Sequence, residues 1–281
     1  MFEKNKLIEE AIKNAFKEDV GAGDHSSLAC IPKTAENKAK LIVKDSGVLA
    51  GVEIAELVFS IYGDFTFKKF IEDGSEVKPG DVAFEVEGNS QGILACERLV
   101  LNIMQRMSGI ATKTQSMLKL IEGCSTKILD TRKTTPNFRV FEKEAVRIGG
   151  GMNHRFALYD MIMLKDNHID YAGGITKALE KTNEYLNNLG KEIKVEIEVR
   201  DFKELNEALE CGLFNRVMLD NFTPSGINKA LKLIDGKYET EASGGITETT
   251  LKSYAETGVD YISVGALTHQ INSLDLSLKA F

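Results

Sequence analysis

Apolar and polar positions follow two different patterns along the chain, and the change falls near residue 120. The first third mixes two periods. Residues 4–16 and 53–62 repeat at helical spacing, whereas 39–51 and 65–71 alternate as half-buried strands do. Within 39–51, a Ser-Gly pair marks a turn between two strands. These features predict an N-terminal region of mixed α+β structure.

Residues 72–88 predict turn, strand, turn and strand, with Pro79-Gly80 at the second turn. The segment resembles the hairpin of lipoyl- or biotinyl-carrier modules. It has no carrier lysine between flanking methionines at its tip, so we interpret it as a plain structural hairpin.

A long helix is predicted over 93–121, with a candidate break at Ser108-Gly109, and this helix is a candidate hinge between domains. After it, short β-rich runs alternate with helical segments. The runs are 127–131, 161–165, 193–199, 216–220, 238–243 and 261–265. Such alternation is typical of parallel strands with right-handed crossovers, and six units would form an incomplete relative of the eightfold barrel.

Nearly every one of these runs ends in polar or glycine residues: Arg132 and Lys133, Lys165, Glu198, Asp220, Ser243-Gly244-Gly245, and Gly265. In β/α barrels the carboxyl ends of the strands and their loops form the active site. Because six strand ends carry such residues, we expect them to converge on one site and the protein to be an enzyme.

Charge is distributed unevenly in an acidic chain of 281 residues and net charge -7. Residues 98–165 hold 12 Lys and Arg against 5 Asp and Glu, so the rest of the chain carries about twice the overall negative charge. A local cluster of cations indicates a small polyanionic ligand, whereas nucleic acid requires a basic surface and a high pI.

Further composition bears on location. No apolar run reaches the ~18 residues of a membrane span, and residues 1–20 lack the pattern of a secretory signal. The four cysteines are scattered without a CxxC pair, which argues against structural zinc and disulfides and favours reduced thiols. We therefore expect a cytoplasmic protein.

The cations at strand ends and in the following loops suit a substrate with carboxylates or phosphate: Arg132, Lys133, Arg155 and Lys165. The alternative is structural ion pairing with the nearby carboxylates Glu142, Glu144 and Asp160. For Arg139 and Arg147, which lie in a helical segment, we favour that structural interpretation.

Three glycine-containing segments are candidate phosphate loops. Residues 149–151 followed by His154 and Arg155 form a weak motif, since glycine runs are often plain turns. Residues 243–247 follow a strand and open a helix, so their amides would face a phosphate. Gly265 and Ala266 repeat that arrangement at the next strand, and two such ends form the usual phosphate site of β/α barrels.

Glu198 and Asp220 place carboxylates at neighbouring strand ends, where they would hold Mg²⁺ partly through water. Glu196 lies two residues before Glu198 and shares its face of the strand, and the sequence does not decide between them. His168 is a candidate ligand or proton donor, and equally a structural histidine.

These motifs occur in an order that resembles the quinolinate phosphoribosyltransferases. They are KEDVGAGDHSS, ERLVLNIMQRMSGIAT, DTRKTTPNFR, EKEAVRIGGGMNHR, KDNHI, VEIEV, MLDNF, ASGGI and TGVDYISVGALT. The resemblance spans essentially the whole chain. It implies an open-faced α/β sandwich over 1–110, joined by a tail of about 270–281, and an incomplete six- or seven-stranded α/β barrel over 111–269.

The resemblance also implies an activity. Quinolinate would attack C1 of 5-phosphoribosyl-1-diphosphate (PRPP), pyrophosphate would leave and the 2-carboxylate would be lost as CO₂, giving nicotinate mononucleotide for NAD synthesis. It implies that quinolinate is held by Arg132, His154, Arg155 and Lys165, with Arg98 supplied by the partner in a homodimer.

For PRPP, the resemblance implies that Lys133 lies between quinolinate and pyrophosphate. Glu198 and Asp220 would handle the ribose and Mg²⁺. The 5-phosphate would be received by Ser243, Gly244, Gly245, Gly265 and Ala266. Lys133, Glu198 and Asp220 are accordingly the expected catalytic residues.

One position departs from the family pattern: Asn137 stands where a glycine is common. Asn is the non-glycine residue that best tolerates positive φ, so the turn is expected to form. Two alternatives remain, a paralogous phosphoribosyltransferase of the molybdate-operon type, and a lyase forming a Schiff base on Lys165.

Overall fold

The structure is a computed structural model that describes residues 2–281, and its chain forms two compact units. Unit 1 comprises the residues up to Ser116 together with 133–151 and 266–281. Unit 2 comprises 117–132 and 152–265. The domain limits inferred from sequence, at 110 and 269, remain predictions.

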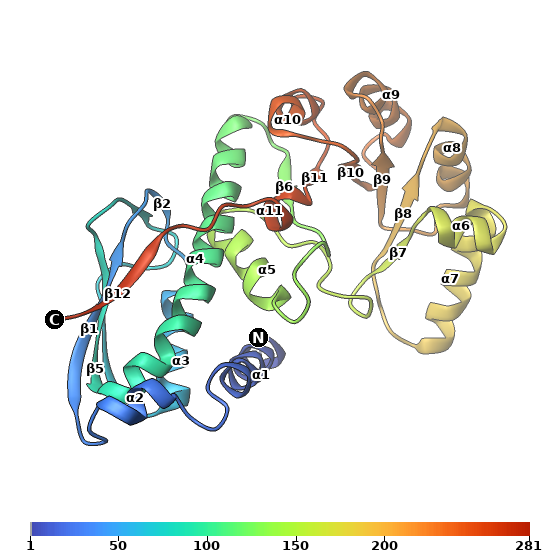
Figure 1. Ribbon diagram of the computed structural model, residues 1–281. Coiled ribbons are helices and arrows are strands. Elements are labelled where there is room, and N and C mark those ends of the chain that lie inside the picture. The colour runs from blue at the N-terminus through green and yellow to red at the C-terminus, as the bar shows by residue number, and fades with distance from the viewer. Residues whose placement is uncertain (1) are drawn as a thin grey trace. The chain divides into compact units, whose positions relative to one another are not determined.

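Unit 1 is built on an antiparallel sheet of order β12-β1-β5-β3 (Figure 1). Its strands are β1 (Glu36–Val43), β3 (Phe65–Lys69), β5 (Val82–Asn89) and β12 (Leu276–Ala280). A short separate pair joins β2 (Gly47–Val48) to β4 (Glu76–Val77). The helices are α1 (Phe2–Asp19), α2 (His25–Cys30), α3 (Val52–Tyr62), α4 (Ser90–Leu120), α5 (Arg139–Ile148) and α11 (Ala266–His269).

The expected hairpin over 72–88 was wrong. Its two strands, β4 and β5, both form but do not pair with each other: β4 pairs with β2, and β5 pairs with β1 and β3. Only two residues of β4 are in the strand, whereas β5 has eight residues with buried apolar positions such as Phe84. Burial of β5 in the middle of the larger sheet therefore decides the pairing.

The helix predicted over 93–121 forms as α4, which continues through Ser108-Gly109 without a break. Gly109 is required for packing, because a Cβ atom there would lie 2.2 Å from the Asn272 carbonyl oxygen. The Ser108 hydroxyl accepts a hydrogen bond from the Ala50 amide at 2.9 Å. These residues let other segments of unit 1 approach the helix closely, so the expected break was wrong, whereas the helix as a hinge stays a prediction.

Unit 2 is a parallel six-stranded sheet of order β6-β11-β10-β9-β8-β7. Its strands are β6 (Lys127–Leu129), β7 (Ile162–Leu164), β8 (Val195–Val199), β9 (Arg216–Asp220), β10 (Glu239–Ser243) and β11 (Tyr261–Ser263). The helices are α6 (Asp166–Ala172), α7 (Ile175–Leu189), α8 (Phe202–Cys211), α9 (Pro224–Ile234) and α10 (Glu248–Ala255). The α/β class and the incomplete barrel are confirmed, with β6 and β7 as the edges of the described sheet.

The two faces of this parallel sheet differ in chemistry. Residues paired across parallel strands point to the same side, so the register assigns every second residue to one face. One face carries apolar residues such as Ile197, Val217 and Leu219, all fully buried. The other face carries the ionisable groups of β8, β9 and β10: Glu196, Glu198, Arg216, Asp220, Glu239 and Glu241. Any chemistry of unit 2 is therefore concentrated on this polar face.

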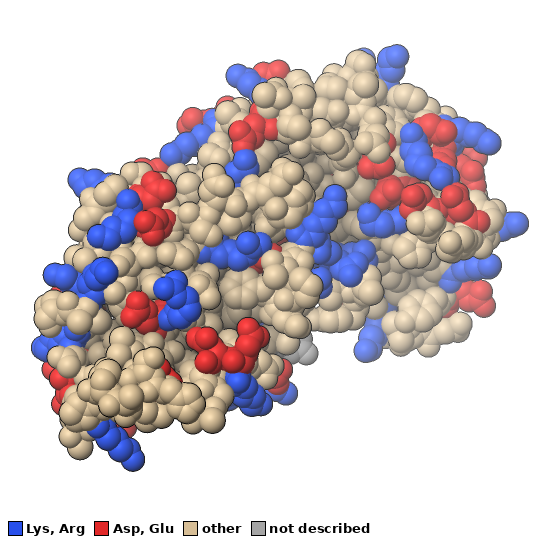
Figure 2. Space-filling view, in the orientation of Figure 1, with Lys and Arg blue, Asp and Glu red and all other residues tan. Residues whose placement is uncertain are grey.

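The surface drawn in Figure 2 carries charged side chains of both signs. On the face drawn in Figure 2, basic and acidic side chains are interspersed over most of the surface. Among the helices that the structure describes, none combines the length and apolarity needed to cross a bilayer.

Candidate functional site

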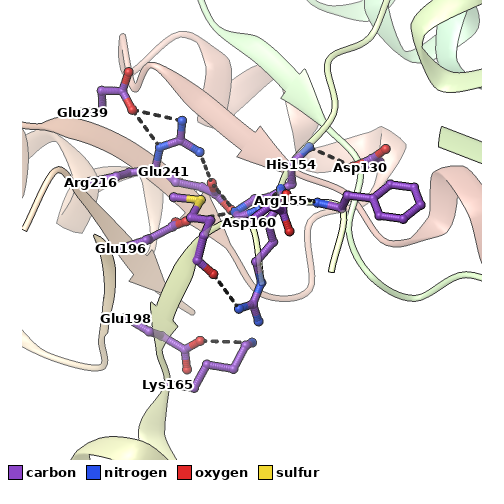
Figure 3. Close-up of polar contacts among 12 residues, drawn as sticks. Asp130, His154, Arg155, Asp160, Lys165, Glu196, Glu198, Arg216, Glu239 and Glu241 are labelled. Carbon is purple, nitrogen blue, oxygen red and sulfur yellow. Dashed lines mark hydrogen bonds and ion pairs between the residues drawn. The ribbon is translucent and has the colours of Figure 1, made fainter. Parts of the chain in front are cut away.

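The carboxyl edge of the unit 2 sheet carries charged groups of both signs. Lys165, directly after β7, lies 3.3 Å (Nζ to Oε2) from Glu198 on β8 (Figure 3). Asp220 ends β9 and is paired in register with Ser243 of β10. We call Lys165, Glu198, Asp220 and Ser243 the upper layer.

The upper layer is partly open to solvent, since nearly half of the Lys165 side chain is exposed. Burial raises the pKa of Glu198, Lys165 opposes the rise, and the nearby charge of Asp220 adds to it. Two carboxylates that feel each other's charge are oxygen donors suited to Mg²⁺, which needs few protein ligands. Glu198 and Asp220 therefore fit a magnesium ion.

Two arginines lie between β6 and β7: Arg132 comes shortly after β6, and Arg155 lies in the loop that leads to β7. Arg155 donates through Nη1 to the Met161 carbonyl at 3.2 Å, which fixes its guanidinium. Burial lowers the pKa of Arg155, and the charge of nearby Arg132 lowers it further. Two half-buried guanidiniums close enough to repel each other favour an anion between or beside them.

A second set of ionisable groups lies deeper in the sheet, away from the carboxyl ends of the strands: His154, Glu196, Arg216 and Glu241. We call this set the lower layer, although Figure 3 draws it above Lys165 and Glu198. The His154 Nε2 atom lies 2.9 Å from Oε2 of Glu196 and 3.3 Å from Oε2 of Glu241. Arg216 Nη1 lies 3.2 Å from the same Glu241 oxygen. Both glutamate side chains are fully buried.

The charge state of His154 depends on its close neighbours in the lower layer. Burial alone would lower the pKa of His154, but Glu196 and Glu241 raise it to about 9. Nδ1 of the same ring accepts a hydrogen bond from the Arg155 amide at 2.6 Å, which disfavours a second proton on Nδ1. Nε2 lies within ion-pair distance of both carboxylates without forming a regular hydrogen bond to either.

The donor atoms of His154, Glu196 and Glu241 lie within 4.8 Å of one another, as in a metal site. The geometry gives them another explanation, because Arg216 pairs with Glu241 and Nε2 of His154 lies at ion-pair distance from both carboxylates. We therefore do not assign a metal to the lower layer.

Asp130, fully buried after β6, holds the loop that carries His154. Its carboxylate accepts hydrogen bonds from the His154 amide at 2.8 Å and from the Asn153 side chain at 2.7 Å. The Asp130 amide in turn donates to the Met152 carbonyl at 3.1 Å. The segment 152–155 is thereby fixed beside β6.

The candidate phosphate loop at 243–247 has the conformation that its glycines predict. Gly244 and Gly245 have φ values of 98° and 62°, in the left-handed region. A Cβ atom on Gly244 would lie 2.2 Å from Oδ1 of Asn221, so no larger residue fits. Gly265 follows β11, and Ala266 begins the short helix α11 of unit 1.

The interpretation of 149–151 as a phosphate loop was wrong. The three amides donate to carbonyls of α5, those of Ala145, Arg147 and Val146, so they do not face an anion. A Cβ atom on Gly149 would lie 2.5 Å from the Ala111 carbonyl oxygen of α4. The glycines therefore serve close packing within unit 1.

Besides Ala266, two of the expected site residues belong to unit 1. Lys133 is exposed, and its carbonyl accepts a hydrogen bond from the Thr268 hydroxyl at 2.8 Å. The segment after it is held by Glu142, which accepts from the Thr135 amide at 3.1 Å and pairs with Arg106. Arg98 is exposed on α4.

The structural interpretation of the helical arginines agrees with the contacts. Arg147 pairs with Glu144, which also pairs with Lys4. Arg139 donates to the Thr134 hydroxyl at 2.9 Å. Asp160, weighed as an ion-pair partner, accepts hydrogen bonds from backbone amides within its own loop.

Two further expectations concern His168 and Asn137. Nδ1 of His168 accepts a hydrogen bond from the Lys165 amide at 3.0 Å, a capping contact at the start of α6 that supports its structural interpretation. Asn137 has a φ of 63°, so the turn does adopt the positive-φ conformation expected for it.

Sequence reasoning missed Asp130, Arg216 and Glu241 as parts of the site. A signal was present: ETEAS places polar residues at every second position, as VEIEV does, and RVMLD has Arg216 and Asp220 at alternate positions with Met218 between them. Period-two polarity within fully buried strands indicates a polar interior face.

Comparisons with known proteins agree with this geometry. Residues 110–279 match the family described as "Quinolinate phosphoribosyl transferase, C-terminal domain", and residues 24–108 match the corresponding N-terminal domain. The chain belongs to the quinolinate phosphoribosyltransferase family.

Members of this family are similar over nearly the whole chain. A tobacco protein, quinolinate phosphoribosyltransferase [decarboxylating] 2b, is 42% identical over 288 residues, covering 97% of this chain and 82% of its own. The probable nicotinate-nucleotide pyrophosphorylase [carboxylating] of Bacillus subtilis is 39% identical, covering 96% and 92%. The crystal structure of NadC from Streptococcus pyogenes is 39% identical with a TM-score of 0.90, covering 98% and 97%.

Proposed function

We propose that this protein is a phosphoribosyltransferase that joins quinolinate to PRPP and decarboxylates the product. The products would be nicotinate mononucleotide, pyrophosphate and CO₂, in NAD biosynthesis. The observation that carries the proposal is the upper layer, where the Lys165 ammonium meets Glu198 at 3.3 Å beside Asp220. Such a site offers a cation to a carboxylate and carboxylates to a sugar cation.

The cations would hold the acceptor. Arg132, Arg155 and Lys165 lie at or after the ends of β6 and β7 and suit the two carboxylates of quinolinate, and the resemblance adds His154 and Arg98. Held in this way, the pyridine nitrogen would face C1 of the ribose. Positioning of this kind supplies a large part of the rate enhancement.

The acidic groups and glycine loops would hold the donor. As pyrophosphate leaves, positive charge grows on the ribose ring, and Glu198 or Asp220 would stabilise it. Lys133 would balance the leaving group, and the 5-phosphate would bind at residues 243–245 and 265–266. When bound, Mg²⁺ would be held by Glu198 and Asp220 and would neutralise charge on the pyrophosphate.

After the ribosyl bond forms, the pyridinium ring accepts the electron pair released as CO₂ departs. A proton then replaces the carboxylate on the ring carbon. No organic cofactor is required, so the residues mainly orient the reactants and stabilise charge.

We also propose a cytoplasmic homodimer in which Arg98 acts in the partner's site. Its exposure on α4 would allow contact with another subunit. Arg98→Ala and Lys133→Ala proteins, each inactive alone, should regain activity when mixed and allowed to exchange subunits. Failure of exchanged mixtures to regain activity would contradict the sharing of sites.

The decisive assay offers quinolinate, nicotinate and nicotinamide separately to the purified protein with PRPP and Mg²⁺. We expect turnover of quinolinate alone, with one CO₂ released per nucleotide formed. Turnover of nicotinate without quinolinate would overturn the substrate assignment. A borohydride-trapped adduct on Lys165 would instead favour a Schiff-base lyase.

A further inference from the structure

The proposed reaction assigns no role to the glutamates of the lower layer. Glu196 and Glu241 have fully buried side chains in the middle of the polar face of the sheet. Burying carboxylates is costly, and replacing such groups with apolar residues often does not destabilise a protein. Their presence directly below the upper layer therefore requires an explanation beyond stability.

The contacts of His154 supply one. On one side of the ring, Nε2 lies 2.9 Å from Glu196 and 3.3 Å from Glu241. On the other side, Nδ1 accepts a hydrogen bond from the Arg155 amide at 2.6 Å. The imidazole thus connects the two buried carboxylates to the main chain of Arg155.

The main chain is fixed on the preceding side as well. The His154 amide donates to Asp130 at 2.8 Å. The backbone N–H groups of both His154 and Arg155 therefore have defined acceptors. The guanidinium of Arg155 is held in turn by the Met161 carbonyl at 3.2 Å. Few positions remain for Arg155 as long as the ring of His154 keeps its orientation.

Arg216 completes the set from the opposite side. It contacts Glu241 at 3.2 Å and Glu239 at 3.0 Å, and its guanidinium lies over the Tyr261 ring at 4.1 Å from the centroid. Its charge lowers the pKa of Glu241 and so favours a carboxylate beside Nε2 of His154. A carboxylate held in this way orients the histidine as second partners orient catalytic and metal-bound histidines.

We propose that Glu196 and Glu241 are positioning residues for quinolinate, which act through His154 to fix the main chain of Arg155 and the direction of its guanidinium. The proposal rests on the proposed function, since it takes quinolinate as the anion that Arg155 binds. It makes His154 a link between buried carboxylates and Arg155, with both ring nitrogens engaged by the protein.

The test compares alanine and glutamine at both positions. We expect Glu196→Ala and Glu241→Ala to raise the KM for quinolinate by about tenfold to 100-fold, and to leave the KM for PRPP within about twofold. Glu196→Gln and Glu241→Gln should retain most of the affinity, because an amide oxygen still accepts the Nε2 proton. Glu207→Gln, which alters a carboxylate bonded to Thr176 in unit 2, serves as the matched control.

Equal increases in both KM values, or an unchanged KM for quinolinate in a destabilised variant, would overturn the proposal. If the alanine variants do not fold, the protonation of the His154 ring in the wild-type protein provides the test. ¹⁵N NMR of the wild-type protein should show a proton on Nε2 of His154, assigned among the 4 histidines by the signal missing from His154→Asn. An Nε2 without a proton would contradict the geometry.

These measurements separate the two proposals. Wild-type protein that neither binds nor turns over quinolinate would contradict the proposed function. The NMR experiment needs no substrate, so it would still show whether Nε2 of His154 carries the proton that the geometry requires.

Discussion

Glu196 and Glu198 lie two residues apart on β8 and point to the same face of the sheet, yet their surroundings differ. Glu198, in the upper layer, meets a half-exposed lysine at the open edge of the sheet. Glu196, in the lower layer, is enclosed with His154, which lies 2.9 Å away. Depth along one strand therefore separates a group that can meet substrate from one that holds other residues in place.

The layers also differ in how their charges are compensated. In the lower layer, two carboxylates are matched by Arg216 and by the ring of His154, all of them buried. In the upper layer, Glu198 and Asp220 have Lys165 as a half-exposed cation. The carboxylates of the lower layer thus face positive or polar groups of the protein itself, whereas the upper layer is suited to gaining charge from a ligand.

The largest effect is expected from removing the cation of the lower layer. Arg216→Met would leave Glu241 buried beside Glu196 without the guanidinium that compensates its charge, which should lower the free energy of unfolding by about 3–5 kcal/mol. Urea denaturation followed by circular dichroism measures it.

The matched control is Arg200→Met, which removes an exposed arginine paired with Asp170 and Glu204. An exposed pair contributes about 1 kcal/mol or less, so this variant should be near wild type. Equal losses for the two variants would remove the distinction between the enclosed layer and the surface.

In the upper layer we expect the opposite result, a large loss of activity with little change in stability. Asp220→Asn should reduce kcat by about 100-fold or more, because charge stabilisation at the ribose is lost, and should change stability little. Steady-state assays with saturating quinolinate and PRPP, alongside thermal melts, give both quantities.

Asp235→Asn is the control for this change, since Asp235 is an exposed residue with a φ of 52° that asparagine tolerates. Normal kcat in Asp220→Asn would exclude this carboxylate from the reaction. A large fall in its melting temperature would show that Asp220 stabilises the fold, as the lower layer is expected to do.

The smallest effect concerns an ion pair outside both layers, Glu144 with Arg147 and Lys4 in unit 1. Burial alone would raise the pKa of Glu144, but its two cationic partners lower it below the ordinary 4.5. Its stabilising contribution is therefore present above pH 4.5 and is lost as the pH falls through the lowered value.

Glu144→Gln should consequently cost about 1 kcal/mol at neutral pH, and its difference from wild type should disappear in acid. Unfolding measured over a pH series checks this, with the exposed Glu192→Gln as reference. A difference that persists in acid would show that packing, and not charge, holds this contact.

Most strands and helices could be predicted, because their signals are local. The six parallel strands of unit 2 all form near their predicted limits, and β9 does so over the same residues, 216–220. The candidate residues at strand ends could also be found in this way, since polar residues after apolar runs are visible in the sequence. The family itself followed from DTRKTTP, GGGMNHR and KDNH together.

What could not be predicted depends on partners distant in the chain. β5 pairs with β1 and not with β4, which only competition for the larger sheet decides. Gly109 is explained by the approach of Asn272, and the lower layer joins His154 to Glu196 and Glu241 from separate strands. No local pattern indicates which distant residue fills a given position.

The last strand of unit 1, β12, bears on how the protein is synthesised. It pairs with β1, although the ribosome makes it after the whole of unit 2. Until then β1 has an unpaired edge, which is a template for pairing with another nascent chain. Unit 2 can complete its sheet earlier, so the period in which aggregation threatens is set by the delay between unit 2 and residues 276–280.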